Sequence, residues 1–486
     1  MEELLEAGEI EKDPSGRLWH IAHVPPAWDD GSPTWKVDPN HANWARFWEL
    51  LKKRIFALPQ KGLALTAEEE SDQEKIQFAG VVFGRAPEGW EWHDLFDSLK
   101  IRFATCAFLD EADFRHVQSR TDLDLRYCLF LRRADFDDLS IQGGGLDLSD
   151  STFVKQLSLS NAQISGDLKG NRIHCFGEAA VLDSSIGGVT EISQSVLYGP
   201  NGFEKTTFIG DVNISYCRFL GLVGMAGTTF RHDAKVLECF FSSDDVTFTG
   251  ECHGDFVLGG CVLESSDVAY MQFHKAAYFS GTRFRQSARF QNTNFHGKVS
   301  FRNAVFESDA TFQDVEFHGP IEFHNTVFAG VADLSRCSFP QAPSFFHSGF
   351  RGAEFRRVAD FTNSAFFAWG AFAGTKFHQP VLFSPAVLRS DASFNKALAA
   401  AKQSSTGATE ADTVAPGEEG KPDQFLSELE AAFQTLKVAM ASQQARLEEQ
   451  RFYHFELVAR RRQTKRHCSK ESSPLCTALR ASTVHL

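Results

Sequence analysis

Residues 273–317 read FHKAAYFSGTRFRQSARFQNTNFHGKVSFRNAVFESDATFQDVEF. A phenylalanine recurs every eleven residues in this stretch, and the series continues beyond it to Phe394. Its members are Phe273, Phe284, Phe295, Phe306, Phe317, Phe328, Phe339, Phe350, Phe361, Phe372, Phe383 and Phe394. A second series lies between them and makes the spacing alternate between six and five: Phe279, Phe290, Phe301, Phe312, Phe323, Leu334 and Phe345. The stretch is therefore an internal repeat.

A spacing of five and six residues fits neither regular element, because helices repeat apolar residues at three and four and strands at two. It fits a chain that bends after every short side and points one large apolar side chain inward from each. Four such sides close a coil of about 20 to 22 residues, and stacked coils pair as β-strands. A small residue stands two positions before many of the phenylalanines, as Ala304, Ala310, Ala353 and Ala359 do, and it should also point inward. The sequence thus predicts an all-β solenoid.

The small-x-Phe units, such as Ala304-Val305-Phe306 and Ala359-Asp360-Phe361, resemble the core motif of the pentapeptide-repeat proteins. The alternating spacing is most similar to the Phe-rich bacterial subgroup of that family. The resemblance extends from about Phe78 to Phe394. It implies a right-handed quadrilateral β-helix that acts as a scaffold and has no shared catalytic residue.

The remaining segments differ from the repeat. Residues 1–75 are rich in tryptophan, and from Asn40 a helix is expected with one apolar face, formed by Trp44, Phe47, Trp48, Leu51 and Ile55. We expect this segment to cap the first coil, since a solenoid exposes an apolar end; a separate aromatic binding module is the alternative. We expect the repeat to extend over residues 76–397, with a helical insertion near 84–100. A flexible linker is expected over 398–424, a C-terminal helical hairpin over 425–466 and a disordered tail over 467–486.

The C-terminal segment is similar to one that follows the repeats in many membrane-associated bacterial members of the family. The matching residues are our candidates for partner binding: Phe433, Leu436, Lys437, Phe452, Tyr453, Glu456, Arg460 and Arg461. Transmembrane helices usually follow in those relatives, whereas residues 467–486 are polar here. This indicates either a soluble variant or a chain that has lost its natural end. The basic run Arg460–Arg466 is a candidate contact to an anionic membrane surface.

Composition narrows the function. The net charge of −14 disfavours a general nucleic-acid binder, because phosphate binding needs a basic face. Five of the ten cysteines fall at or near ladder positions, and we interpret them as reduced core residues of a cytoplasmic protein: Cys128, Cys217, Cys239, Cys261 and Cys337. No catalytic or cofactor motif is found, so we expect no enzyme activity and no cofactor. Histidines that follow ladder phenylalanines, among them His274, His296, His318 and His378, should form a partial surface stripe, and we favour exposed corner residues over a metal site.

The sequence therefore favours a non-enzymatic scaffold or adaptor that binds a protein partner of unknown identity through a rod and the C-terminal helices. One alternative is an acidic DNA-mimic rod that acts on a topoisomerase, by analogy with other members of the family. Another is a membrane-linked sensor or channel-associated subunit, or a soluble remnant of a membrane-associated pentapeptide-repeat protein. The partner, the oligomeric state and the biological process are left open.

Overall fold

The structure is a computed structural model of the chain, and it divides into two units, Met1–Gly254 and Asp255–Leu486. Each unit is described by itself. The residues described are 10–12, 18–20, 24, 32–38, 41–56, 75–86, 92, 100–244, 246–339, 349–366, 372–379, 381–382 and 387–388, with single helical positions between 430 and 460.

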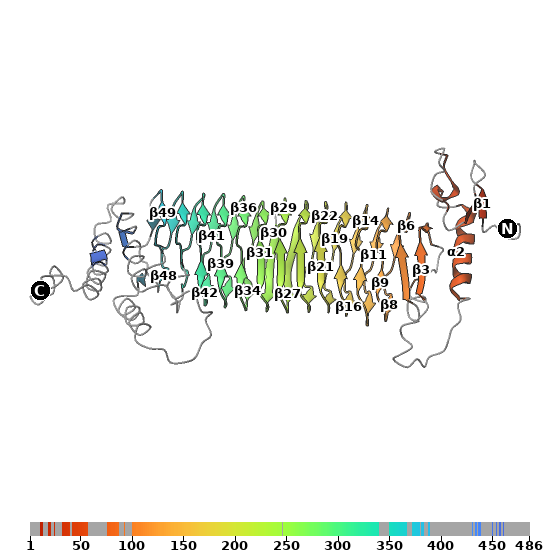
Figure 1. Cartoon of the computed structure of the whole chain (residues 1–486), viewed down its shortest axis with the longest axis horizontal. Coiled ribbons are helices and arrows are strands. Elements are labelled where there is room, and N and C mark those ends of the chain that lie inside the picture. Colours follow the sequence, from red (N-terminus) through yellow and green to blue (C-terminus); the bar gives the residue numbers. More distant parts are fainter. Residues whose placement is uncertain are drawn as a thin grey trace, which may run out of the picture. The chain divides into compact units, whose positions relative to one another are not determined.

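Unit 1 contains a parallel β-helix whose coils place short strands on four faces (Figure 1). Face 1 is formed by β3 (Lys75–Ala79), β5 (Lys100–Ala104), β9 (Leu123–Asp124), β13 (Leu146–Asp147), β17 (Leu168–Lys169), β21 (Thr190–Ser193), β25 (Val212–Ser215) and β28 (Ala234–Leu237). Face 2 is formed by β4 (Val82–Phe83), β6 (Ala107–Phe108), β10 (Leu129–Phe130), β14 (Thr152–Phe153), β18 (His174–Cys175), β22 (Val196–Leu197), β26 (Arg218–Phe219) and β29 (Phe240–Phe241).

The other two faces of unit 1 belong to one sheet. Face 3 is formed by β7 (Ala112–Asp113), β11 (Ala134–Asp135), β15 (Leu157–Ser158), β19 (Ala179–Ala180) and β23 (Asn201–Gly202). Face 4 is formed by β8 (Gln118–Ser119), β12 (Ser140–Ile141), β16 (Gln163–Ile164), β20 (Ser185–Ile186) and β24 (Thr207–Phe208). The longer β27 (Val223–Phe230) pairs with both β23 and β24, so it turns the corner between the two faces, and β30 (Val246–Cys252) pairs along it.

Unit 2 repeats the pattern. Face 1 contains β31 (Phe256–Gly259), β35 (Ala277–Tyr278), β39 (Val299–Ser300) and β43 (Ile321–Glu322). Face 2 contains β32 (Val262–Leu263), β36 (Arg283–Phe284), β40 (Val305–Phe306), β44 (Val327–Phe328), β46 (Glu354–Phe355) and β49 (Lys376–Phe377). Face 3 contains β33 (Ser266–Asp267), β37 (Ala288–Arg289), β41 (Ala310–Thr311), β45 (Ala332–Asp333), β47 (Ala359–Asp360) and β50 (Val381–Leu382), and face 4 contains β34 (Met271–Phe273), β38 (Asn294–Phe295) and β42 (Glu316–Phe317). A separate pair is formed by β48 (Ala365–Phe366) and β51 (Val387–Leu388).

The phenylalanines fill the interior as stacks of parallel rings, which confirms the solenoid predicted from their spacing. On face 2 of unit 2, the rings of Phe284 and Phe306 have centroids 4.7 Å apart and planes that differ by 5°. In unit 1, Phe130 and Phe153 stack at 4.7 Å in the same way. This distance equals the spacing of paired strands, so each ring lies directly over the ring of the next coil. Burying each of them contributes about 1.5–3 kcal/mol.

The small residue two positions before each inward side chain is also buried, as expected, and where it has a hydroxyl it completes the corner hydrogen bonds. Thr326 Oγ1 donates to the carbonyl of Phe301 at 2.7 Å, one coil earlier. Ser195 Oγ donates to the carbonyl of Gly170 at 2.7 Å and accepts the N–H of Ile173 at 2.9 Å. These side chains satisfy backbone groups at the bends, which a buried corner would otherwise leave without a partner.

Every second corner requires a residue in the left-handed region. Positive φ values recur at intervals of eleven or twelve residues from Thr105 to Lys205, and they include residues without a special preference for this region, such as Tyr127 and Arg172. In unit 2 the same corners are mostly occupied by Asn, Asp or Gly, as at Asn303 and Gly281. Asn, Asp and Gly adopt this conformation at least cost.

The series of elevens changes face at Phe350. Phe339 stacks on Phe317, on face 4, at 5.4 Å, whereas Phe350 stacks on Phe323, on face 1, at 4.7 Å. The coil that contains the step from Phe339 to Phe350 is longer by five residues, since Phe328 and Phe355 stack at 4.7 Å but are 27 residues apart. The eleven-residue spacing of phenylalanines therefore continues through Phe350, but the phenylalanines from Phe350 onward lie on different faces from those that the spacing alone would predict. Phe383 and Phe394 lie outside the described residues.

The N-terminal segment contains the expected helix, α2 (Ala42–Phe56), whose apolar face packs against the first described coil. The Phe47 ring lies 5.9 Å from that of Phe83, and Trp48 Nε1 donates to the carbonyl of Arg85 at 2.8 Å. Trp92 is buried and stacks on Phe114 at 5.4 Å. These contacts are of the kind that a cap makes, and the cap itself stays a prediction. Most of the expected helical insertion near 84–100 lies outside the described residues.

Among the residues that the structure describes, eight cysteines are buried thiols outside any disulfide, and they include all five that we interpreted as core residues. Several occupy the small inward position, where Cys217 Sγ donates to the carbonyl of Ile192 at 3.4 Å. Burial raises the pKa of the Cys175 thiol to about 11. The thiol is therefore protonated at neutral pH and is a poor nucleophile.

Candidate functional site: an apolar face of unit 1

Face 2 of unit 1 presents apolar side chains to solvent. Successive residues of a strand point to opposite sides, so the residue after each inward side chain points outward. From β6 to β26 these outward residues are all apolar, and we call them the apolar column: Leu109, Leu131, Val154, Phe176, Tyr198 and Leu220. The other outward position of the same strands is apolar only in part, and it holds Ala107, Leu129, Thr152, His174, Val196 and Arg218. We call the outward side of β6 to β26, with the apolar column, the apolar face.

The members of the apolar column are held in line by the sheet. The N–H of Phe176 donates to the carbonyl of Phe153 at 2.8 Å, and the N–H of Tyr198 donates to that of Cys175 at 2.8 Å. The two aromatic rings therefore stack, with centroids 4.8 Å apart. They are nevertheless 50% and 44% exposed. Aromatic residues that are stacked, aligned and half in solvent form a preorganised apolar surface.

Glycines border the most exposed part of the apolar column. Gly177 and Gly199 follow the two aromatic residues, and Gly221 follows Leu220. A Cβ at Gly199 would lie 2.3 Å from the carbonyl oxygen of Gly177, and one at Gly221 would lie 2.1 Å from that of Gly199. The close stacking of these coils thus excludes side chains at the three glycine positions. The rings stand beside bare backbone, which leaves their edges accessible.

The charges next to the apolar face differ from those on the other faces of unit 1. Elsewhere basic side chains pair with aspartates of the same or the neighbouring coil: Arg115–Asp113 at 2.6 Å, Arg126–Asp124 at 2.8 Å, Arg133–Asp135 at 2.9 Å and Arg172–Asp150 at 2.5 Å. Arg132, Lys155 and Arg218 are exposed at or beside the apolar face. None of them has an ion-pair partner among the residues that the structure describes. They are thus three basic groups without an ion pair to any described residue, in a chain with a net charge of −14.

Two of the predicted C-terminal residues, Lys437 and Arg460, pair with the buried carboxylate of a third, Glu456. Phe433 and Leu436 are buried, and so is Glu456, whose side chain is 2% exposed. Lys437 Nζ donates to Glu456 Oε2 at 2.6 Å, and Arg460 Nη2 lies 2.9 Å from Glu456 Oε1. The motif is thus a salt-bridged helical contact, because a buried carboxylate needs such partners.

Further contacts extend this cluster to the surface. Arg460 Nε donates to Glu430 Oε1 at 2.5 Å, and this bond raises the pKa of the guanidinium further. The Lys437 ammonium lies 5.3 Å from the ring centroid of Tyr453, which is 50% exposed. Phe452, Arg461 and the rest of the basic run to Arg466 lie outside the described residues. The predicted role of the segment in partner binding stays a prediction.

Three of the predicted surface histidines form a row on face 4 of unit 2. The ring of His296 stacks between those of His274 and His318, with centroid distances of 5.5 and 4.9 Å. Desolvation, together with the charges of His318 and His274, lowers the pKa of His296. His378 is on face 2 instead, 3.3 Å from Glu354, because the longer coil at Phe350 shifts the later residues.

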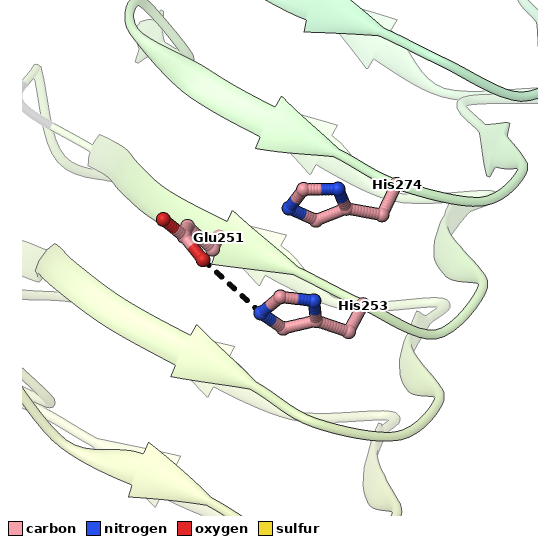
Figure 2. Close-up of side chains that lie close together, drawn as sticks. All are labelled: Glu251, His253 and His274. Atoms are coloured by element: carbon pink, nitrogen blue, oxygen red, sulfur yellow. Dashed lines mark ion pairs between the residues drawn. The ribbon is translucent and has the colours of Figure 1, made fainter.

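Figure 2 shows a further exposed histidine contact at the end of β30. His253 Nε2 lies 3.1 Å from Glu251 Oε2, and the ring also lies 3.3 Å from Arg231 Nη1. His274, drawn in the same figure, is the first member of the row of unit 2. The contact lies on the surface between outward side chains, and it is an ion pair only when His253 is protonated.

Comparison with known families agrees with this geometry. The model of the pentapeptide repeats, in nine copies, matches residues 269–316. The chain contains a pentapeptide-repeat β-helix. No curated protein and no solved structure matches it. Among the residues that the structure describes, no helix is long and apolar enough to cross a membrane.

The pentapeptide-repeat assignment explains the interior but not the apolar face, which our sequence reasoning missed. A signal was present, because positions 109, 131, 154, 176, 198 and 220 are all apolar at intervals of 22 or 23 residues. These residues follow the inward position, where polar residues are expected. The spacing of inward residues is less regular in the first half of the chain. The sequence alone therefore did not show that these six residues lie side by side in successive coils.

Proposed function

We propose that the protein is a non-enzymatic scaffold that binds a protein partner through its pentapeptide-repeat β-helix and its C-terminal helical segment. The observation that carries this proposal is the apolar face of unit 1. Exposed apolar patches of this kind are typical of interaction sites, since isolated exposed apolar residues are common but aligned ones are not. A β-helix of such repeats is well suited to a scaffold because each coil supports the next.

The C-terminal segment supports a second contact. The ion pairs of Glu456 with Lys437 and Arg460 hold its helical positions together. Tyr453 remains exposed beside Lys437. An exposed tyrosine beside a cation has the amphipathic character that is enriched in protein interfaces.

The absence of enzyme activity is part of the proposal. Pentapeptide-repeat β-helices are typically structural. The described cysteines, which are the strongest potential nucleophiles of the chain, are all buried. The raised pKa of Cys175 keeps that thiol protonated at neutral pH, and this removes the usual basis of cysteine reactivity.

Affinity co-purification with quantitative mass spectrometry tests the scaffold proposal. Three baits are compared: the full chain, a chain that stops at Gly420, and the full chain with Glu456→Gln. A partner lost from both altered baits would assign recognition to the C-terminal segment. A partner retained by both would assign it to the β-helix or to the N-terminal segment. Recovery of no specific partner by any bait would contradict the scaffold proposal.

The two alternatives make different predictions. A DNA mimic needs an unneutralised acidic face, whereas many aspartates of the described β-helix are paired, as Asp124 is with Arg126 and Asp314 with Arg336. Inhibition of gyrase in a supercoiling assay would nevertheless support it. A membrane-linked role predicts that the chain sediments with anionic vesicles and is released by salt, which would assign the contact to the basic run Arg460–Arg466.

A further inference from the structure

We propose that the apolar face of unit 1 binds a single amphipathic helix of a protein partner, whose apolar stripe is bordered by acidic side chains. This inference rests on the proposed function and specifies its docking surface. Three properties of the apolar face support an amphipathic helix as its ligand: its dimensions, its charges and the fixed positions of its side chains.

The dimensions fit one helix. The apolar column extends over six coils, so it is about 24 Å long at a strand spacing of about 4.8 Å. The two outward positions of each strand are separated by two residues, or about 7 Å, and their side chains extend the width to about 10 Å. A helix with its side chains is about 10–12 Å wide, and about 16 residues span 24 Å.

The area argues against a second copy of the chain as occupant. A face of about 24 Å by 10 Å offers about 240 Å². A stable protein interface buries about 800 Å² on each partner. A dimer formed through this face would need a much larger contact than the apolar residues provide, whereas a helix that lies along the column is contacted over its whole apolar stripe.

The basic side chains beside the apolar face indicate which residues should border the apolar stripe of the bound helix. Arg132 and Lys155 lie beside the column at one corner, and Arg218 lies on the face between Val196 and Phe240, with its guanidinium 6.0 Å from the Phe240 ring. None of the three pairs with an acidic group of the described chain. A helix with Glu or Asp beside its apolar stripe would neutralise them, and a basic helix would be repelled.

The preorganisation of the face favours this mode of recognition. Phe176 and Tyr198 are fixed by the sheet and by their mutual stacking, so binding costs them little side-chain entropy. The glycine row Gly177, Gly199 and Gly221 leaves one side of the rings open. Apolar residues of a helix at intervals of three and four would contact the rings from that side.

Binding of fluorescent synthetic peptides to the full chain tests the proposal. The probe is an 18-residue helix-forming peptide with a Leu/Phe stripe bordered by glutamates. Its controls are the same peptide with lysines in place of the glutamates and a scrambled peptide of identical composition. Fluorescence anisotropy should give a dissociation constant at least about ten times lower for the acidic peptide than for either control, and the difference should decrease at high salt.

Variants locate the binding. The double variant Phe176→Ser/Tyr198→Ser should weaken binding of the acidic peptide at least about ten-fold. The matched control is Ile209→Ser/Leu237→Ser, which removes two exposed apolar side chains from faces 4 and 1 of the same unit and should leave binding unchanged. Lys155→Glu/Arg218→Glu should reduce or reverse the preference for the acidic peptide. Circular dichroism of each variant checks that the fold is retained.

Several outcomes would overturn the proposal. Equal binding of the scrambled peptide, or equal loss in both double variants, would show that the face is not specific. A dimer in sedimentation equilibrium that Phe176→Ser/Tyr198→Ser dissociates would identify a second copy as the occupant, and flotation with vesicles that depends on the same residues would identify a lipid surface. If a co-purified partner were retained by this double variant, the scaffold function would stand and the docking face would be wrong.

Discussion

Face 2 is built alike in the two units, but its outer surfaces differ. From β6 to β26 of unit 1 the residue after each inward side chain is apolar, whereas in unit 2 the corresponding residues are Glu264, Arg285, Glu307, Ala329, Arg356 and His378. The charged ones form ion pairs on the surface of unit 2, for example Arg285–Glu264 at 2.5 Å and Glu307–Arg283 at 3.3 Å. The repeat constrains what points inward and leaves the outer position free. In unit 2, charged side chains at the outer position pair with other side chains of the same unit. In unit 1, the apolar side chains at this position remain available to a partner.

The largest expected loss of stability comes from core substitutions, which test whether the interiors of the two units are equivalent. Phe153→Ala in unit 1 and Phe306→Ala in unit 2 each remove a fully buried ring from a stack on face 2. Each should destabilise the fold by about 3–5 kcal/mol in urea unfolding followed by circular dichroism. A much smaller cost in one unit would show that the interiors are not equivalent.

A smaller effect is expected at the hydroxyls beneath the same face. Thr326→Val in unit 2 and Ser195→Ala in unit 1 remove donors to the carbonyls of Phe301 and Gly170. Each carbonyl is left without this partner inside the coil, so both variants should lose about 1–2 kcal/mol. Urea unfolding measures the loss, and a neutral result for both would contradict the role that we assign to these side chains.

The outer positions should matter less for stability. A double-mutant cycle on Arg285 and Glu264 should give a coupling of about 0.2–1 kcal/mol that decreases with added salt, because both side chains are partly exposed. Phe176→Ser should destabilise the fold by about 1 kcal/mol, because the half-exposed ring loses its stacking on Tyr198. If Phe176→Ser were as costly as a core variant, the apolar face would be part of the core rather than a surface for a partner.

The pH dependence should also distinguish the two surfaces. The hydrogen bond from Arg356 lowers the pKa of Glu354 on face 2 of unit 2. A carboxyl with a lowered folded-state pKa stabilises the fold above its unfolded value of about 4.3, and this contribution is lost as the pH falls through the folded value. The stabilities of the wild type and Glu354→Gln should therefore converge in acid. Phe176→Ser should show a constant difference from the wild type over the same range.

Much of the fold could be predicted because the inward positions repeat strictly. Steric fit selects Phe and small residues there, and the eleven-residue series therefore identified the coil and the burial of Ala304 and Ala310. The change of face at Phe350 was not predicted, because the longer coil keeps phenylalanine at a multiple of eleven; the only signal was a slip by one residue in the second series, which continues at Phe355 and Phe366. The apolar face was missed for a related reason: outward positions are not constrained by packing and have no fixed pattern to search for.

The longer coil has a consequence for how such a chain can change. Between Phe328 and Phe355 the coil has 27 residues, and yet the rings meet at 4.7 Å and Gly349 N donates to the carbonyl of Ile321 at 2.6 Å. The described coils on both sides thus stay stacked although this coil has five additional residues. Peptides of chosen sequence could be added to this coil, which would make the β-helix a carrier for displayed epitopes or affinity tags.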